Sequence, residues 1–251
     1  MSASTPVTND NSDMPSFRYP VICIDGPSGA GKGTVTWRLA QTLGYRLLDS
    51  GALYRIVGLK AFEADLLNIA GEQSIDEEAL LALTQSLQII FEPNSDSGRV
   101  DIIVNGAKIG EQVRNETVGG YASQVAVYPK VRQALLKLQQ DMATQSGLVA
   151  DGRDMGTVVF PDADVKVYLT ASATARAERR VAQLLKAGQV ADFDAILATI
   201  KARDERDENR ATAPSRPAKD ALVLDSSNLD ADAVYELVKK HCQDKGVSFN
   251  R

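Results

Sequence analysis

The sequence predicts an α/β fold with a five-stranded parallel sheet, which a small antiparallel insert interrupts. Short apolar runs alternate with longer stretches of helical periodicity, and this alternation is typical of a parallel sheet covered by helices. A glycine-rich turn directly follows the first apolar run, as expected where a buried strand ends in a loop. The insert is indicated by short β patterns around Asn105-Gly106, a dipeptide that favours a tight hairpin turn.

Each element can be justified in chain order. Residues 1–19 have the polar composition of a flexible tail. The strands of the parallel sheet are expected at 21–25, 46–49, 148–151, 165–169 and 222–225. Helices are expected at 31–43, directly after Asp49, and at 117–145, 172–187, 192–210 and 230–243. The insert has β runs at 87–92, 100–104 and 107–109, and we expect a subdomain over roughly 62–116.

The composition is that of a globular protein with an acidic balance. Of 251 residues, 44% are hydrophobic and 24% charged, and the net charge of −5 argues against broad binding to nucleic acid or acidic membranes. No apolar run approaches the roughly 18 residues of a membrane span, and the N-terminus lacks the pattern of a secretory signal. Two distant cysteines and one histidine indicate neither a disulfide framework nor a zinc site. We therefore expect a cytoplasmic protein that binds any polyanion in a local pocket.

The strongest local motif is Gly26-Pro27-Ser28-Gly29-Ala30-Gly31-Lys32-Gly33-Thr34, which matches G-x-x-x-x-G-K between a strand and a helix. Glycines let the backbone wrap closely around an anion, and the helix N-terminus adds partial positive charge. Lys32 adds a full charge, so the motif predicts binding of a nucleoside triphosphate. The hydroxyl comes one place later than usual, at Thr34, which makes its assignment to Mg²⁺ less secure.

Two further loops leave strands at the same end of the sheet. The segment 49–55 enters a helix, where Ser50 can act as the cap and Arg55 faces the same end as Lys32. Asp151 ends the next strand, where a carboxylate would either approach a metal ion or structure the loop; the residues favour neither reading. Arg153 is expected to clamp a phosphate, because phosphoryl transfer needs positioning and positive charge around the moving group.

Arginines also cluster at helical spacing in two later segments. Arg176, Arg179 and Arg180 fall largely on one face, which a solvated basic surface would explain as well as phosphate binding would. Arg203 and Arg210 lie along one side of the next helix. Acidic residues interleave with them, so ion pairs within that helix are the structural alternative.

These segments together resemble the bacterial cytidylate kinase family of P-loop nucleoside monophosphate (NMP) kinases. The resemblance is carried by the GKGT spelling at 31–34 and by the segments 47–55, 150–161 and 203–210, and it spans about 20–243. It implies transfer of the ATP γ-phosphate to CMP or dCMP, with Mg²⁺ accompanying ATP. It also implies a P-loop NMP-kinase-like core, an NMP-binding insert and a short helical lid that closes over ATP and excludes water.

The resemblance implies roles for individual residues on the acceptor side. Ser50 and Arg55 would hold the acceptor nucleotide, with Arg55 at its phosphate. Asp154 would accept a hydrogen bond from the N4 amino group of cytosine, where uracil presents a carbonyl. Ser123 and Arg132 would also contact the base, although Ser123 by itself resembles an ordinary helical serine.

The remaining roles concern phosphates, sugar and metal. Lys32, Arg153 and Arg203 are the implied catalytic residues, and Asp207 would accept from ribose hydroxyls. ATP is assigned to residues 26–34 and Arg179, and the metal candidates are Thr34 and Asp151. The full CMP-binding set is Ser50, Arg55, Ser123, Arg132, Arg153, Asp154, Arg203, Asp207 and Arg210.

The expected division of the chain follows from these assignments. The core comprises 20–61, 117–171 and 211–251, the NMP-binding insert comprises 62–116, and the lid comprises 172–210. We expect a monomer whose partners are the small molecules ATP and CMP or dCMP, without nucleic acid or membrane.

Two rival functions remain for comparison. Another small-acceptor P-loop kinase, such as an adenylate kinase of the long type, would need a long lid after Leu169 and would not need the β insert. A GTP-driven switch would need a guanine reader of the N-K-x-D type, which does not occur in the sequence, and would leave the acceptor-side arginines without a role.

Overall fold

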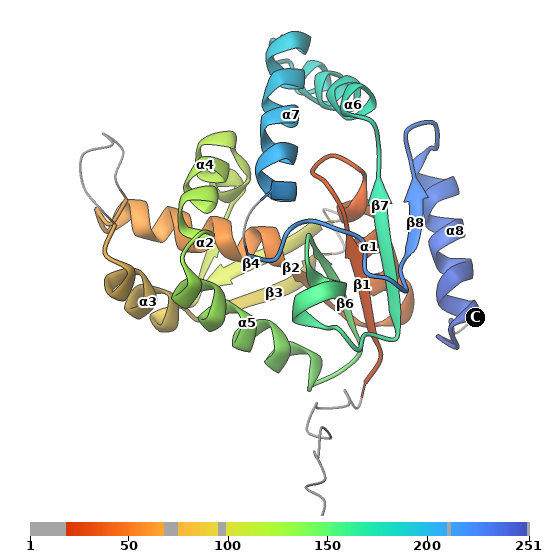
Figure 1. The fold of residues 1–251 in the computed structure, drawn as a ribbon, viewed down its shortest axis with the longest axis horizontal. Coiled ribbons are helices and arrows are strands. Elements are labelled where there is room, and N and C mark those ends of the chain that lie inside the picture. The colour runs from red at the N-terminus through yellow and green to blue at the C-terminus, as the bar shows by residue number, and fades with distance from the viewer. Residues whose placement is uncertain (1–18, 68–74, 95–98, 210–211, 250–251) are drawn as a thin grey trace, which may run out of the picture.

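The central sheet is parallel, as the sequence predicts. A computed structural model describes residues 19–67, 75–94, 99–209 and 212–249. Its five-stranded sheet has the order β2-β6-β1-β7-β8 (Figure 1). The strands are β1 (Val21–Asp25), β2 (Arg46–Asp49), β6 (Leu148–Gly152), β7 (Val165–Thr170) and β8 (Leu222–Asp225). Because β1 is the middle strand, the loop after it opens at the centre of the sheet's carboxyl edge, where ligands bind in open α/β sheets.

Helices cover both faces of this sheet. Ile22 and Ile24 are fully buried in the core that includes residues of α1 and α8, whereas Val21 and Cys23 are buried in the opposite core with residues of α2 and α5. Successive side chains of a strand point to opposite faces, so this alternation is what a sheet buried on both sides requires. The helices are α1 (Lys32–Leu43), α2 (Ser50–Glu63), α3 (Glu77–Ser86), α4 (Glu116–Val125), α5 (Pro129–Ala143), α6 (Ala173–Lys186), α7 (Phe193–Asn209) and α8 (Ala231–Asp244).

The small antiparallel sheet is also confirmed. It contains β3 (Ile89–Asn94), β4 (Arg99–Val104) and β5 (Ala107–Ile109), in that order. Asn105 and Gly106 have φ values of 50° and 79°, the left-handed conformation that a type I′ turn requires at both positions. The turn expected between the first two β runs includes 95–98, which lie outside the described residues.

Two helical details differ from the prediction. The stretch 117–145 is divided into α4 and α5, because Tyr128 is extended (φ −81°, ψ 118°) and Pro129 begins the second helix. Proline disfavours helical geometry in the residue before it and is well tolerated in a first helical turn. Helix α3 is missing from the prediction, although Asp76 followed by Glu77 and Glu78 is a helix-start signal; the Asp76 carboxylate accepts from the backbone N–H of Glu78.

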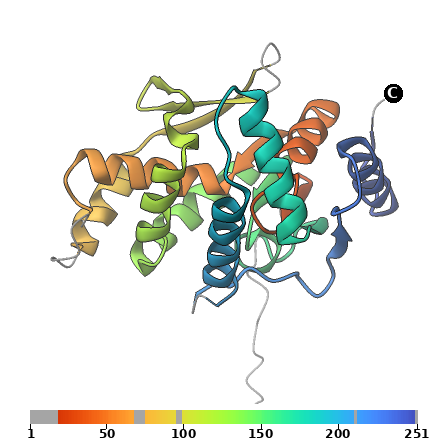
Figure 2. The same ribbon diagram turned by 90° about the horizontal axis from the view of Figure 1, so that it is seen from above.

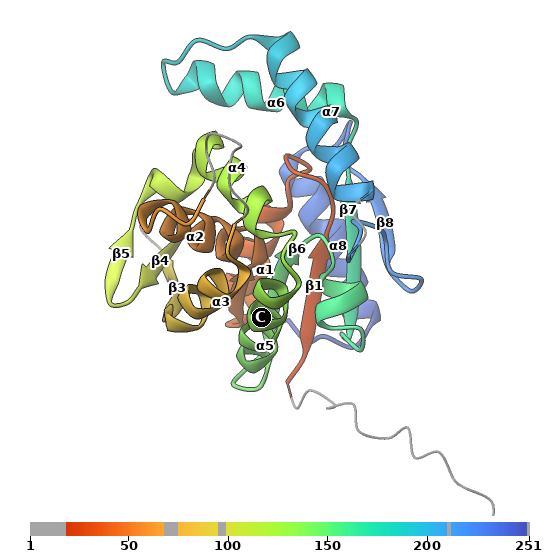
Figure 3. The same cartoon turned by 60° about the vertical axis from the view of Figure 1, so that its left-hand side comes forward.

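Helices α6 and α7 pack against each other and stand beyond the carboxyl edge of the parallel sheet (Figures 1 and 2). Figure 3 shows them on the same side of the molecule as the loop that follows β1. Helix α2 runs through Glu63, across the expected boundary between the core and the insert at 61 and 62. Among the described residues, no helix is long and apolar enough to cross a membrane.

Candidate active site

The loop that joins β1 to α1 has the backbone of an anion-binding turn. Gly26, Gly29 and Gly31 have φ values of 139°, 81° and 99°, which favour glycine. A Cβ at Gly26 would lie 1.9 Å from the carbonyl oxygen of Leu169 at the end of β7, so no other residue fits there without moving the strand. Gly31, the N-cap of α1, contributes no side-chain cap, so the first N–H groups of this helix can face a ligand.

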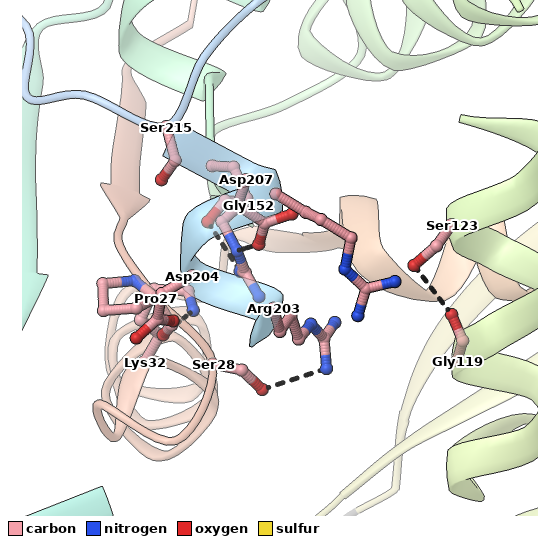
Figure 4. Close-up of polar contacts among 12 residues, drawn as sticks. Pro27, Ser28, Lys32, Gly119, Ser123, Gly152, Arg203, Asp204, Asp207 and Ser215 are labelled. Carbon is pink, nitrogen blue, oxygen red and sulfur yellow. Dashed lines mark hydrogen bonds and ion pairs between the residues drawn. The ribbon is translucent and has the colours of Figure 1, made fainter. Parts of the chain in front are cut away.

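Lys32 is buried at the base of this loop. Its Nζ donates to the carbonyl oxygen of Pro27 at 3.0 Å (Figure 4). The same Nζ lies 3.6 Å from Oδ1 of Asp151. Burial lowers the pKa of Lys32, and the Arg153 guanidinium lowers it further while Asp151 opposes the shift. A polyphosphate entering the loop would bring negative charge to Nζ and favour the charged form of Lys32.

Asp151 is the penultimate residue of β6 and lies opposite Asp49 of β2 and Ile24 of β1. Burial raises the pKa of Asp151. A Cβ added at Gly33 would lie 3.9 Å from Oδ2 of Asp151, so the carboxylate borders the first turn of α1, in which Thr34 is exposed. The described residues contain no group of three or more His, Cys, Asp or Glu side chains that could enclose a metal. This donor set fits Mg²⁺ bound with a nucleotide, which usually takes one or two carboxylates plus phosphates and water.

Helix α7 contributes two contacts to the loop region. Nη1 of Arg203 donates to Oγ of Ser28 at 3.4 Å, and Oδ2 of Asp207 accepts from Nε of Arg153 at 3.0 Å (Figure 4). Arg153 also donates to the carbonyl oxygen of Gly152 at 3.2 Å. The structure therefore brings Arg153, Arg203 and Asp207 to the same end of the sheet as Lys32.

Arg176 is not part of a solvated basic face, so that reading is wrong for this residue. It is 4% exposed, and its guanidinium donates to the carbonyl oxygens of Ala171 and Ser28 and to both carboxylate oxygens of Asp204. This fork joins α6, α7 and the phosphate loop. The pairs of Asp204 and Asp207 are thus made with residues outside their own helix, unlike the intrahelical pairs considered above.

Arg179 of α6 contacts the residue that follows β8. Its guanidinium donates to the hydroxyl and the carbonyl oxygen of Ser226. The buried Ser226 hydroxyl in turn donates to the carbonyl oxygen of Ala30 at 2.9 Å. Arg179 is therefore adjacent to the loop assigned to ATP, in a position set by the end of β8.

Arg132 and Asp154 form a buried ion pair away from the phosphate loop. Nη2 of Arg132 lies 2.6 Å from Oδ2 of Asp154, and the two side chains are 11% and 6% exposed. The Arg132 guanidinium also lies 5.6 Å from the centre of the Tyr54 ring. A pocket of about 200 Å³ adjoins the pair, lined by Tyr54, Arg132, Gln133, Leu136, Gln139, Asp154, Val158, Val159, Thr212 and Ala213.

The first of the other predicted acceptor residues, Ser50, lies at the start of α2. Ser50 is buried, but Asp49 is the N-cap of α2 and accepts from the backbone N–H of Ala52, which corrects the predicted cap. Because the helix begins at Ser50 itself, the N-cap position falls one residue earlier, on Asp49.

Arg55 donates to the carbonyl oxygens of Val113 and Asn115, just before α4. The Ser123 hydroxyl donates to Gly119 within α4 and lies apart from the Ser28, Lys32 and Arg203 group (Figure 4). Arg210 lies outside the described residues.

Sequence reasoning missed two buried groups of this site. One is the Arg176–Asp204 fork, and the other is Asp25, whose carboxylate accepts from the backbone N–H groups of Met155 and Gly156. The only available signal for Asp25 was a carboxylate at the end of an apolar strand, directly before the glycine-rich loop.

Sequence comparisons with a family model and with known proteins give the same family. A family model described as cytidylate kinase matches residues 22–244. A cytidylate kinase of Pasteurella multocida is 53% identical over 223 residues, 89% of this chain and 95% of that protein. Cytidylate kinase of Pseudomonas paraeruginosa is 50% identical, covering 90% of this chain and 96% of that protein. Cytidylate kinase 1 of Haemophilus influenzae is 50% identical, covering 91% and 96%.

Proposed function

The chain belongs to the cytidylate kinase family, which transfers the γ-phosphate of ATP to CMP or dCMP, and we propose how its residues divide this reaction. The observation that carries the proposal is that Arg153 and Asp154, the two residues that follow β6, contact different elements. Arg153 contacts the helix beside the phosphate loop, and Asp154 is paired with Arg132 at a pocket. One strand end can thus serve the phosphates and the base of the acceptor.

The donor side is assigned to the phosphate loop. The N–H groups of residues 26–34 would bind the ATP phosphates, and Lys32 would place its charge on them. Arg179 would complete the ATP site from α6. Asp151 and Thr34 would hold Mg²⁺, which when bound with ATP neutralises charge on the phosphate oxygens.

The acceptor side is assigned to the second group of residues. Ser50 and Arg55 would hold CMP, with Arg55 at its phosphate, and Asp207 and Arg210 would contact its sugar. Asp154, Arg132 and Ser123 would read the cytosine, which a carboxylate recognises through its N4 amino group.

The transfer step needs positioning rather than a covalent intermediate. A phosphate oxygen of CMP forms a bond to the γ-phosphorus as the bond to the ADP oxygen breaks, and Arg153 and Arg203 would stabilise the charge on the moving group. Residues 172–210, which include α6 and α7, would act as the lid that excludes water. Residues 62–116 would form the NMP-binding insert, and residues 20–61, 117–171 and 211–251 the core. A monomer is part of this proposal.

A panel of nucleotide acceptors tests the substrate assignment. With ATP as donor, kcat/KM for CMP and dCMP should exceed that for UMP, AMP and GMP by about 10²-fold, since a site built around a polar partner discriminates strongly. Equal activity with UMP or AMP would contradict the base assignment. Equilibrium dialysis of labelled CMP without ATP should show binding, which a nucleotide-driven switch would lack.

Replacing the clamp arginines should slow the chemical step. Arg153→Met and Arg203→Met are each expected to lower kcat by about 10²- to 10³-fold, because they stabilise charge that develops in the transition state. Steady-state kinetics would measure this, with Arg38→Met as the matched control: Arg38 pairs with Asp232 on the exposed surface between α1 and α8. If either variant changed only the KM for ATP, its role on the moving phosphoryl group would be withdrawn.

A further inference from the structure

Asp25 connects the phosphate loop to the segment that carries Asp154. It is the last residue of β1, is 4% exposed and directly precedes Gly26. Its Oδ1 accepts from the backbone N–H of Met155 and its Oδ2 from that of Gly156, both at 2.8 Å. These two N–H groups open a short π-helical turn, Met155–Val159, which begins immediately after Asp154.

The turn needs this cap from outside. The first N–H groups of a helical segment have no partner within it. Asp154 occupies the N-cap position but makes no side-chain cap, since its carboxylate pairs with Arg132. Asp25 therefore satisfies, from a neighbouring strand, N–H groups at the start of the turn, while the Asp154 carboxylate pairs with Arg132 at the pocket.

The contact is closely packed around a charged group. A Cβ at Gly156 would lie 3.5 Å from Oδ2 of Asp25 and 3.2 Å from the Lys166 side chain. Burial raises the pKa of Asp25 to about 6, while the two backbone N–H groups oppose the shift. A carboxylate is thus kept in a costly environment, where it supplies two acceptor oxygens that an isosteric amide cannot supply.

We propose that Asp25 is a positioning residue that sets the place of Asp154 relative to the phosphate loop and thereby supports selection of cytosine. The proposal rests on the proposed role of Asp154. Asp25 acts on the substrate only through the Met155–Val159 turn. Because Asp25 directly precedes the phosphate loop, its two hydrogen bonds fix the position of the segment that carries Asp154 relative to that loop.

The test is Asp25→Asn, which keeps the size of the side chain but replaces one acceptor oxygen by an NH₂ group. This NH₂ group would face the backbone N–H of Met155 or Gly156, so one of the two hydrogen bonds would be lost. We expect the ratio of kcat/KM for CMP to that for UMP to fall about 10-fold, within the range that a lost polar partner gives. The Kd of a nonhydrolysable ATP analogue should change less than about 2-fold, since the phosphates are bound by other groups. The matched control is Asp164→Asn, because Asp164 accepts from the backbone N–H of Val21 at 2.8 Å, at the opposite end of β1.

Three comparisons decide the outcome. If Asp25→Asn lowers the melting temperature but leaves the CMP to UMP ratio at the Asp164→Asn value, Asp25 is only structural and the proposal is overturned. If Asp154→Asn changes the CMP to UMP ratio and Asp25→Asn does not, the proposal for Asp25 is overturned but the role of Asp154 in reading the base stands. If neither variant changes the ratio, the role of Asp154 is overturned, and the proposal for Asp25 falls with it. The double variant should show a ratio no lower than Asp154→Asn alone, because residues acting through one contact are not additive.

A second variant keeps the test usable if Asp25→Asn does not fold. Gly156→Ala perturbs the same turn from the other side, since its Cβ would lie only 3.2 Å from the Lys166 side chain and 3.5 Å from Oδ2 of Asp25, so the tight contact with Lys166 requires a small shift beside the Asp25 contact. It should lower the CMP to UMP ratio in the same direction, and an unchanged ratio in a folded Gly156→Ala protein would overturn the proposal.

Discussion

Lys32→Ala should reduce kcat by at least about 10²- to 10³-fold while CMP binding survives, because a preorganised charge on the transferring phosphates is lost. Lys32 is buried between the carbonyl oxygen of Pro27 and the carboxylate of Asp151, so its charge is held at the base of the phosphate loop before any ligand arrives. The assigned acceptor residues lie on other elements, which is why CMP affinity should remain.

Two measurements test this expectation. Single-turnover kinetics with CMP would give the rate of transfer, and equilibrium dialysis of labelled CMP without ATP would give the acceptor Kd. Lys137→Ala is the matched control, because Lys137 pairs with Asp141 on the exposed face of α5. If Lys32→Ala turned over at nearly the rate of the unmodified protein, the assignment of the phosphate loop to the ATP phosphates would be contradicted.

Asp154→Asn should lower the CMP to UMP ratio of kcat/KM by about 10²-fold or more. The amide has nearly the size of the carboxylate but can rotate to present its NH₂ group to O4 of uracil, which the carboxylate repels. The Arg132–Asp154 pair is nearly enclosed, so water would do little to restore discrimination.

The ratio has to be measured at one pH and one ATP concentration in both proteins. Asp141→Asn is the control, since it removes the acid of an exposed pair on the helix that carries Arg132. An unchanged ratio in Asp154→Asn would mean that Asp154 only shapes its loop and that cytosine is read by Arg132, Ser123 or both.

The amino-acid sequence alone determines the sheet, the phosphate loop and the hairpin of this protein. Two short, continuous apolar runs, 21–25 and 148–151, are enough to predict central strands of a buried parallel sheet. The structure confirms both strands. Asn105-Gly106 and the glycines of the loop need only the steric freedom of their own backbone. These features are local, so neighbouring residues carry all the information. The α3 helix and the break before Pro129 are local as well, and their cap and proline signals were present in the sequence.

Only the tertiary structure decides which partner each charged group takes. Arg176 and Arg179 are three residues apart, so the sequence places them on the same face of one helix. In the structure, however, Arg176 is buried against Ser28 of the phosphate loop and Asp204 of α7. Asp25 accepts hydrogen bonds from two residues of the turn after Asp154. These residues, Met155 and Gly156, follow Asp25 in the sequence by 130 and 131 positions. The periodicity of apolar residues indicates which face of a helix or strand is buried, but it does not indicate which distant polar group will pair with a buried charge. That choice follows from the packing of β1, β6 and α7 at one edge of the sheet, because a buried charge must be satisfied by whatever donor or acceptor the fold brings within reach.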